Sequence, residues 1–271
     1  MAFLSGSGEV SRYRQIRPTR IAILHGSKLE SRLSNEEYHR SLVQLFSPLN
    51  VRIFSVLEMT QAGMSDLVSS KEYDVIGLIG EPKEFDFTRK FSGRFKKNVD
   101  EDSIVLSFAP NTYFKHAKAY LQVSDAIILC EDLPNQISKV VFHFFESLVV
   151  PSMLNIDLAD VRSIAKGIGL AFNLSNDSSR KIIASLPKSC LVARSALLHF
   201  SCSEDVRLKE VYSISKAIAL KKGLPDMQIN THAEAKKLIR KVNVKMGIRI
   251  KDPSENVNEK RISMTAILFG L

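Results

Sequence analysis

The sequence predicts an α/β protein with a parallel, Rossmann-like N-terminal domain, a central helix and a smaller α+β C-terminal domain. Short apolar runs alternate with helical segments in the first half. A nearly all-apolar run then occupies residues 137–150, and strands and helices in mixed order follow it. Alternating strands and helices are typical of a parallel sheet covered on both faces. A segment that is apolar on all sides is buried on all sides.

The first half contains five short runs that we interpret as strands. They cover residues 20–25, 51–57, 73–79, 104–108 and 126–130, with helices expected at 35–46 and 63–70. The elements divide the chain into a mobile N-terminal arm (1–18), an α/β domain (19–134), the central helix (135–151) and a C-terminal domain (152–271). Pro151 ends the central helix because proline cannot continue it.

The second half predicts an α+β arrangement. A helix is expected from Leu158 to Ala171, broken by Gly167 and Gly169. Further elements are a strand and loop at 172–179, a short helix at 178–186, a strand within 190–200 and a helix at 208–222. The segments 242–250 and 261–268 are expected to pair as a hairpin.

Composition excludes several classes of protein. With 271 residues, 45% hydrophobic and 25% charged, the chain has the composition of a soluble globular protein, and no stretch approaches the ~20 apolar residues of a membrane helix. The N-terminus lacks the apolar core of a signal peptide. The three cysteines form no C-x-x-C pair and no H-E-x-x-H occurs, so we expect no metal site and a cytoplasmic location.

The net charge of +9 is more informative. A basic balance favours acidic partners, such as nucleic acid or an anionic membrane surface. The alternative is that the surplus lysines only keep the surface solvated.

The loop after the central helix carries Asn155, Asp157 and Asp160. Two carboxylates and an amide projected by a buried helix suit the orientation of a water or a metal at a substrate. The alternative is helix capping, in which Asp157 or Asp160 accepts backbone N–H bonds at the start of the next helix. The spacing alone favours the cap.

Residues 155–162 (NIDLADVR) resemble the synergy loop of the FtsZ branch of the tubulin superfamily. Three downstream stretches are similar to the FtsZ C-terminal domain. They are 196–201 with 204–211, 246–250, and 261–270. The resemblance covers the C-terminal half and is weak before residue 120. In FtsZ this loop enters the nucleotide site of the next subunit, and its acidic residues position the water that attacks GTP. The resemblance therefore implies that Asn155, Asp157 and Asp160 act on a neighbouring subunit.

The resemblance fails at the phosphate loops. FtsZ cradles phosphate with two glycine-rich loops, because glycine lets backbone N–H groups approach closely. Here the first loop has one glycine in Gly26-Ser27-Lys28, and the loop after the third strand begins at Gly80 and contains Pro82. We therefore interpret residues 19–134 as a degenerate nucleotide-binding-like domain. GTP or GDP is possible as a ligand but not expected, and at most the chain completes GTP hydrolysis together with a neighbouring subunit.

A basic and aromatic segment stands in place of the second phosphate loop. It comprises Phe85, Phe87, Arg89, Lys90, Phe91, Arg94, Phe95, Lys96 and Lys97. Cations beside aromatics suit single-stranded nucleic acid or an anionic membrane. The favoured alternative is that the phenylalanines fill the emptied pocket while the cations face water.

The leading hypothesis is an FtsZ-like cytoskeletal or cell-division protein, a pseudo-GTPase that acts as a filament partner, cap or regulator through its synergy loop. Its partners would be FtsZ-like subunits, either copies of itself or a paralogue. The chain stops at Leu271, so we expect no C-terminal tether peptide. The alternatives, in order, are a scaffold that polymerises without nucleotide, a membrane or nucleic-acid adaptor, and a GTPase with rebuilt phosphate loops.

Overall fold

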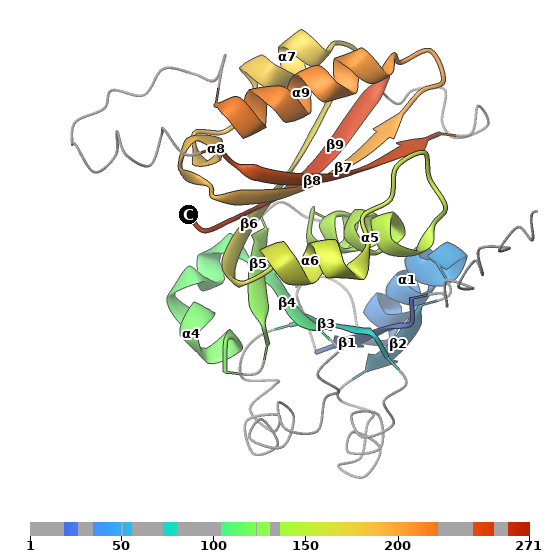
Figure 1. Cartoon of the computed structure of the whole chain (residues 1–271). Coiled ribbons are helices and arrows are strands. Elements are labelled where there is room, and N and C mark those ends of the chain that lie inside the picture. The colour runs from blue at the N-terminus through green and yellow to red at the C-terminus, as the bar shows by residue number, and fades with distance from the viewer. Residues whose placement is uncertain are drawn as a thin grey trace, which may run out of the picture.

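In a computed structural model, nine strands of the described residues form one continuous sheet that spans both halves of the chain (Figure 1). The structure describes residues 19–26, 35–49, 51–55, 73–80, 104–122, 124–130, 136–221, 241–251 and 260–271. The strand order is β2-β1-β3-β4-β5-β6-β9-β7-β8. The predicted helix at 63–70, the arm at 1–18 and the segment 83–97 lie outside the described residues.

The first half forms the parallel part of this sheet. Its strands are β1 (Ile21–His25), β2 (Arg52–Ser55), β3 (Val75–Ile79), β4 (Ile104–Pro110) and β5 (Ala126–Cys130). All of their pairings are parallel. β1, β3 and β5 are buried at every position, as continuous apolar runs require in a sheet covered on both faces. This confirms the predicted α/β class.

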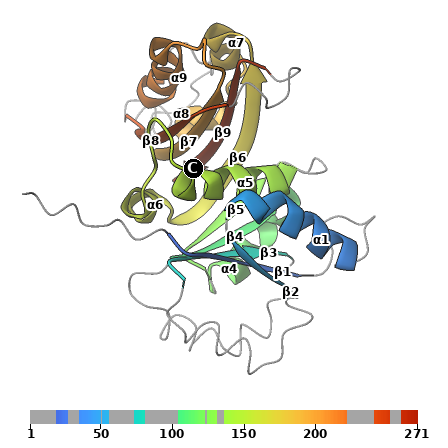
Figure 2. The same ribbon diagram turned by 90° about the vertical axis from the view of Figure 1, so that its right-hand side faces the viewer.

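Helices cover the two faces of the parallel sheet (Figure 2). On one face, α1 (Asn35–Phe46), η1 (Ser47–Leu49) and α5 (Gln136–Val149) pack against alternate residues such as Ile21 and Ile23. On the other, η3 (Asn111–His116) and α4 (Ala117–Tyr120) pack against the intervening residues, such as Ala22 and Leu24. Because successive side chains of a strand point to opposite faces of the sheet, each apolar strand contributes to both of these cores.

The central helix α5 lies between the two halves of the molecule. Its Val140, Val141, Phe144 and Phe145 are buried in the core shared with β3, β4 and β5. Gly77 on β3 makes room for this packing, because a Cβ at that position would lie 2.8 Å from Cζ of Phe145. The predicted, nearly all-apolar central helix is therefore present and buried on most of its circumference.

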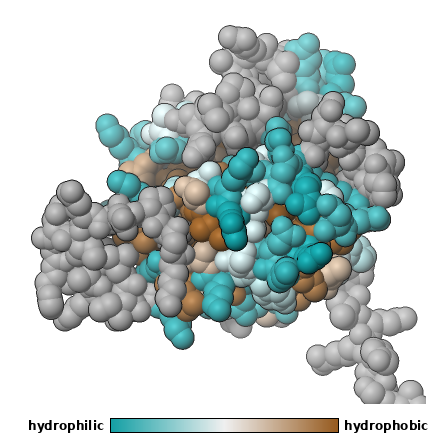
Figure 3. Space-filling model, turned by 90° about the horizontal axis from the view of Figure 1, so that it is seen from above, coloured by the Kyte–Doolittle hydropathy of each residue, from teal (hydrophilic) through white to brown (hydrophobic). Residues whose placement is uncertain are grey.

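The second half continues the same sheet. β6 (Gly167–Asn176) pairs with β5 in parallel and with β9 (Ile262–Phe269) antiparallel, while β7 (Ser195–Cys202) lies between β9 and β8 (Asn243–Ile250). The helices α7 (Ser179–Ala184) and α9 (Leu208–Leu220) cover one face of these strands, and α8 (Ser189–Val192) precedes β7. Seen from the side of α7 and α9, the described surface is mostly hydrophilic, with hydrophobic side chains between (Figure 3).

Two expectations for this half are wrong. The helix expected through Ala171 is α6 (Leu158–Ile164), and β6 begins at Gly167, where φ is +73°. Glycines disfavour a helix interior, and the free edge of β5 supplies hydrogen-bond partners for a strand. The expected hairpin of 242–250 with 261–268 does not form, since β7 separates the two strands. β9 pairs with β6 on one edge and with β7 on the other, and nearly all of its residues are buried. It is therefore an interior strand of the sheet and not one arm of a hairpin with β8.

No helix among the described residues is long and apolar enough to cross a membrane.

Candidate functional site

The loop between α5 and α6 is fastened to the C-terminal strands. The backbone N of Ile248 donates to the carbonyl of Leu154 at 2.7 Å, and the N of Leu154 donates back to Ile248 at 3.4 Å. Ile156 is 2% exposed and anchors the loop in the main core. Residue 247 is glycine, and a Cβ there would lie 3.3 Å from the Leu154 carbonyl oxygen. The close approach of this loop to β8 therefore depends on a small residue at that position.

The outer side of the loop combines apolar and polar groups. Met153 is 58% exposed and Leu154 37% exposed. Asn155 and Asp157 are exposed beside them. The Asn155 side chain accepts a hydrogen bond from the backbone N of Ser152 at 3.0 Å, and the Ser152 hydroxyl also donates to it. These contacts hold the loop in one shape while its side chains face solvent.

The two aspartates have local partners. Asp157 is the N-cap of α6, and its Oδ1 accepts the backbone N–H of Asp160 at 2.6 Å. This confirms the capping role that the spacing favoured. The Asp160 carboxylate bonds the Lys245 ammonium at 2.5 Å, and this hydrogen bond raises the Lys245 pKa. The cap uses Oδ1 of Asp157, and Oδ2 of this exposed carboxylate can still accept a hydrogen bond from a partner.

The carboxyl edge of the parallel sheet is where a nucleotide would lie in a fold of this kind. Gly26 is at this edge, and its backbone N donates to the carbonyl of Ile79 at 2.9 Å. The carbonyl of Gly80 accepts the Tyr120 hydroxyl at 2.5 Å. Buried His25 bonds His39 of α1, with its Nε2 2.8 Å from Nδ1. The backbone N–H of Gly26 and the carbonyl of Gly80, the two glycines predicted to bind a cofactor, are therefore both used in hydrogen bonds within the protein. Ser27 and Lys28 lie outside the described residues.

A buried ionic cluster joins α5 to the C-terminal strands, and the sequence analysis missed it. Glu146 is 3% exposed; its Oε1 accepts from Arg249 at 2.8 Å, and its Oε2 lies 3.0 Å from Nε2 of His199 and 3.3 Å from Nδ1 of His143. Burial acts to raise the Glu146 pKa. The hydrogen bonds from His143 and His199 and the charge of Arg249 outweigh burial and lower the pKa to about 2. Desolvation lowers the His199 pKa.

The sequence carried one signal for this cluster. His143 and Glu146 are three residues apart in a helix, which places them on one face. His199 and Arg249 arrive from β7 and β8, far away in the chain. Ligand atoms of His143, Glu146 and His199 all lie within 4.8 Å of one another, close enough for a metal ion. The expectation of no metal site therefore stays a prediction.

Together these features define a two-part α/β protein with a buried central helix and an exposed acidic loop at the end of that helix. No protein family model matches the chain, and no curated protein matches its sequence. Solved structures do match. The chain is similar to a structure titled "FtsZ dimer, empty" from M. jannaschii, at 11% identity and a TM-score of 0.62, over 94% of this chain and 89% of that one. It is also similar to an FtsZ W319Y mutant from M. jannaschii, at 10% identity and a TM-score of 0.56, over 93% and 90%.

The protein therefore has an FtsZ/tubulin-like fold over almost its whole length, as the resemblance predicted. The resemblance was detected in the C-terminal half, and the structural match extends it to the parallel sheet.

Proposed function

We propose that this chain is an FtsZ-like filament partner, cap or regulator that acts through the loop 151–157 and holds no GTP site of its own. The FtsZ/tubulin-like fold supports a cytoskeletal or cell-division type of role. The partner would be an FtsZ-like subunit, either a second copy or a paralogue.

One observation carries the proposal: the loop is rigidly held yet exposes Met153 and Leu154 next to the Asp157 carboxylate. Exposed apolar groups beside a charge, on a loop positioned by a rigid scaffold, are typical of a binding surface. A partner that covers Met153 and Leu154 would receive the charge of Asp157 at its own surface.

The edge of the parallel sheet supports the second part of the proposal. The N–H of Gly26 already donates to Ile79 and is not available to a phosphate oxygen. β1 ends at the buried His25. At such a position a phosphate-binding loop uses glycine, whose backbone N–H can approach phosphate closely, rather than a bulky side chain. Together with the scarcity of glycine in these loops, this geometry favours a chain that contributes only the acidic half of a shared site.

The test is to mix the purified protein with an active FtsZ and to measure GTP turnover and co-sedimentation. Asp157→Asn is the informative variant, since asparagine also caps helices while the charge is lost. We expect the wild-type protein to change GTP turnover and Asp157→Asn to lose that effect. Asp205→Asn, an exposed carboxylate on a distant turn, is the matched control and should behave as wild type.

A second pair of variants separates binding from chemistry. Leu154→Ser should weaken co-sedimentation, whereas Leu208→Ser, which is 44% exposed on α9, should not. If the wild-type protein neither co-sediments with FtsZ nor alters its turnover, the filament role is wrong. Tight binding of GTP by the pure protein would contradict the loss of its own site.

A further inference from the structure

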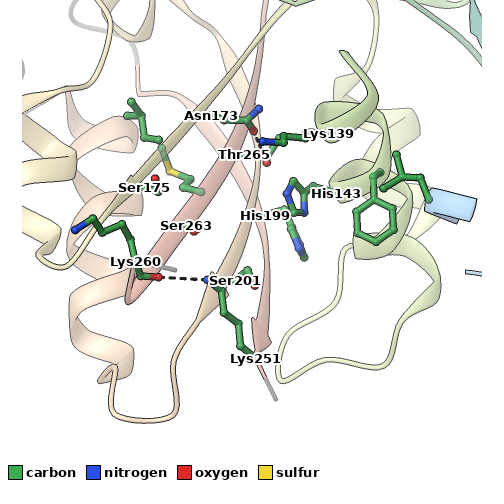
Figure 4. Close-up of a pocket in the computed structure, with 14 residues that line it drawn as sticks. Lys139, His143, Asn173, Ser175, His199, Ser201, Lys251, Lys260, Ser263 and Thr265 are labelled. Atoms are coloured by element: carbon green, nitrogen blue, oxygen red, sulfur yellow. Dashed lines mark hydrogen bonds between the residues drawn. The ribbon is translucent and has the colours of Figure 1, made fainter. Parts of the chain in front are cut away.

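A cavity of about 590 Å³, lined by both polar and apolar side chains, lies between the central helix and the strands β6, β9 and β7 (Figure 4). This volume is in the range of pockets that bind small molecules. Lys139 and His143 face it from α5, and the strands supply the opposite wall. The polar residues of that wall are Asn173, Ser175, His199, Ser201, Ser263 and Thr265, with Lys251 and Lys260 at one end.

The strand wall is built from two rows of polar side chains in register. One row is Asn173, Thr265 and His199, and the other is Ser175, Ser263 and Ser201. The neighbouring residues on the same strands, among them Phe172, Phe200 and Met264, belong to the core under α7 and α9. A sheet face that packs under a helix is normally apolar, so a polar face opposite α5 calls for a ligand or water.

Hydroxyl groups in this wall are available to a ligand. Ser201 is buried and Ser263 is half-buried, and neither hydroxyl has a hydrogen-bond partner within the described part of the chain. Thr265 donates to the Asn173 side chain at 2.6 Å, which orients that amide beside the cavity. The Ser201 and Ser263 hydroxyls line the cavity and can donate to a ligand there, whereas the buried Nδ1 of His199 has no partner among the described residues.

The charges around the cavity are positive. Lys251 is buried, and its ammonium donates to the carbonyl of Lys260 at 3.2 Å. Lys260 also bonds Asp177 at 3.0 Å on the outside, and Lys139 has no partner in the described ranges. Among the described residues, no carboxylate lines the cavity.

The same charges disfavour a metal ion in the adjoining cluster of His143, Glu146 and His199. The single carboxylate there is already paired with Arg249. A divalent cation bound at Glu146 would lie near Arg249 and beside a cavity lined by lysines, with no second anion among the described residues to balance it. An anion placed against the hydroxyl rows would instead gain from every charge that faces the cavity.

We infer that this cavity binds a small multivalent anion of metabolite size, carrying phosphate or carboxylate groups, held by Lys139, Lys251 and the hydroxyls of Ser201 and Ser263. The lysines would neutralise the ligand, and the hydroxyls would donate to its oxygens. Lys139 lies on α5 and the other three residues lie on or after the C-terminal strands, so the ligand would bridge the two halves of the molecule.

Isothermal titration calorimetry on the purified full chain tests this inference, with sodium pyrophosphate in one arm and sodium citrate in the other. We expect saturable binding of at least one anion, weaker at high salt. Lys139→Met, or Ser201→Ala combined with Ser263→Ala, should each raise the dissociation constant by about tenfold, because each removes contacts to a charged ligand. Lys216→Met, an exposed lysine on α9 outside the cavity, is the matched control and should bind as wild type.

Preference for pyrophosphate or for citrate identifies the anion class. If neither anion binds, or if Lys216→Met weakens binding as much as Lys139→Met does, the inference is wrong. Binding of Zn²⁺ alone that His199→Asn abolishes would also overturn it, in favour of a metal. Far-UV circular dichroism of each variant confirms that it folds.

Discussion

Replacing Glu146 with glutamine tests the buried ionic cluster most directly. The carboxylate of Glu146 receives Arg249 on one oxygen and His199 and His143 on the other. Glutamine keeps the shape of the side chain but has no charge, and it offers one accepting oxygen in place of two. The Arg249 guanidinium would then lose its ionic contact with Glu146, and the contact between α5 and β8 would weaken.

The magnitude follows from the pKa. The fall in the Glu146 pKa from an ordinary value of 4.5 to about 2 corresponds to roughly 3 kcal/mol in favour of the folded state at neutral pH. Removing one partner of a buried ion pair costs a similar amount, about 3 kcal/mol. Because the folded-state pKa is the lower one, this stabilisation is complete above pH 4.5 and is lost as the pH falls toward 2. At pH 3 roughly half of it remains.

Urea denaturation at pH 7 and pH 3 measures both quantities. We expect Glu146→Gln to lower the free energy of unfolding by about 3 kcal/mol at pH 7 and by clearly less at pH 3. The matched control is Glu36→Gln, which removes an exposed carboxylate paired with Arg40 and should cost at most about 0.5 kcal/mol. If the two variants lose the same stability at pH 7, or if the loss in Glu146→Gln does not depend on pH, the ionic account of this cluster is refuted.

Three further predictions concern local contacts. Asp157→Ala should lower the free energy of unfolding by about 1 kcal/mol in urea denaturation, and Asp157→Asn much less, because only alanine removes the cap of α6; equal losses would contradict the cap. Gly77→Ala should lower the free energy of unfolding by about 1–3 kcal/mol, because the new Cβ meets the Phe145 ring. Adding Phe145→Leu to this variant should cost less than Phe145→Leu costs alone, and strictly additive losses would count against the clash. Burial raises the pKa of Cys190 to about 12 and that of Cys202 to about 11, so at pH 8 both should react with a thiol reagent only after denaturation; fast labelling of the folded protein would argue against their burial.

The parallel half of the fold could be predicted because its signals are local. β1, β3 and β5 are short apolar runs, and burial on both faces requires that pattern. The central helix could be predicted for the same reason. The cap at Asp157 also followed from spacing, since N-capping depends on residues three apart in the chain.

The strand order and the buried clusters could not be predicted in this way. β6 contains two glycines that resemble helix breakers, and its strand conformation is fixed by β5 on one side and β9 on the other. Phe269 packs over Gly169, where a Cβ would lie 2.6 Å from its ring. Glu146 appears in the sequence as one acid in an apolar helix; its partner Arg249 is 103 residues away.

The sequence by itself determined the α/β class, the central helix and the acidic loop with its cap, because these depend on periodicity and on neighbours in the chain. Only the tertiary structure decided which strand lies beside which, what surrounds Glu146, and that Ser175, Ser263 and Ser201 form one row opposite α5. Hydrogen bonds between strands and the pairing of buried charges are made between distant segments. Their partners are selected by packing, which no local pattern encodes.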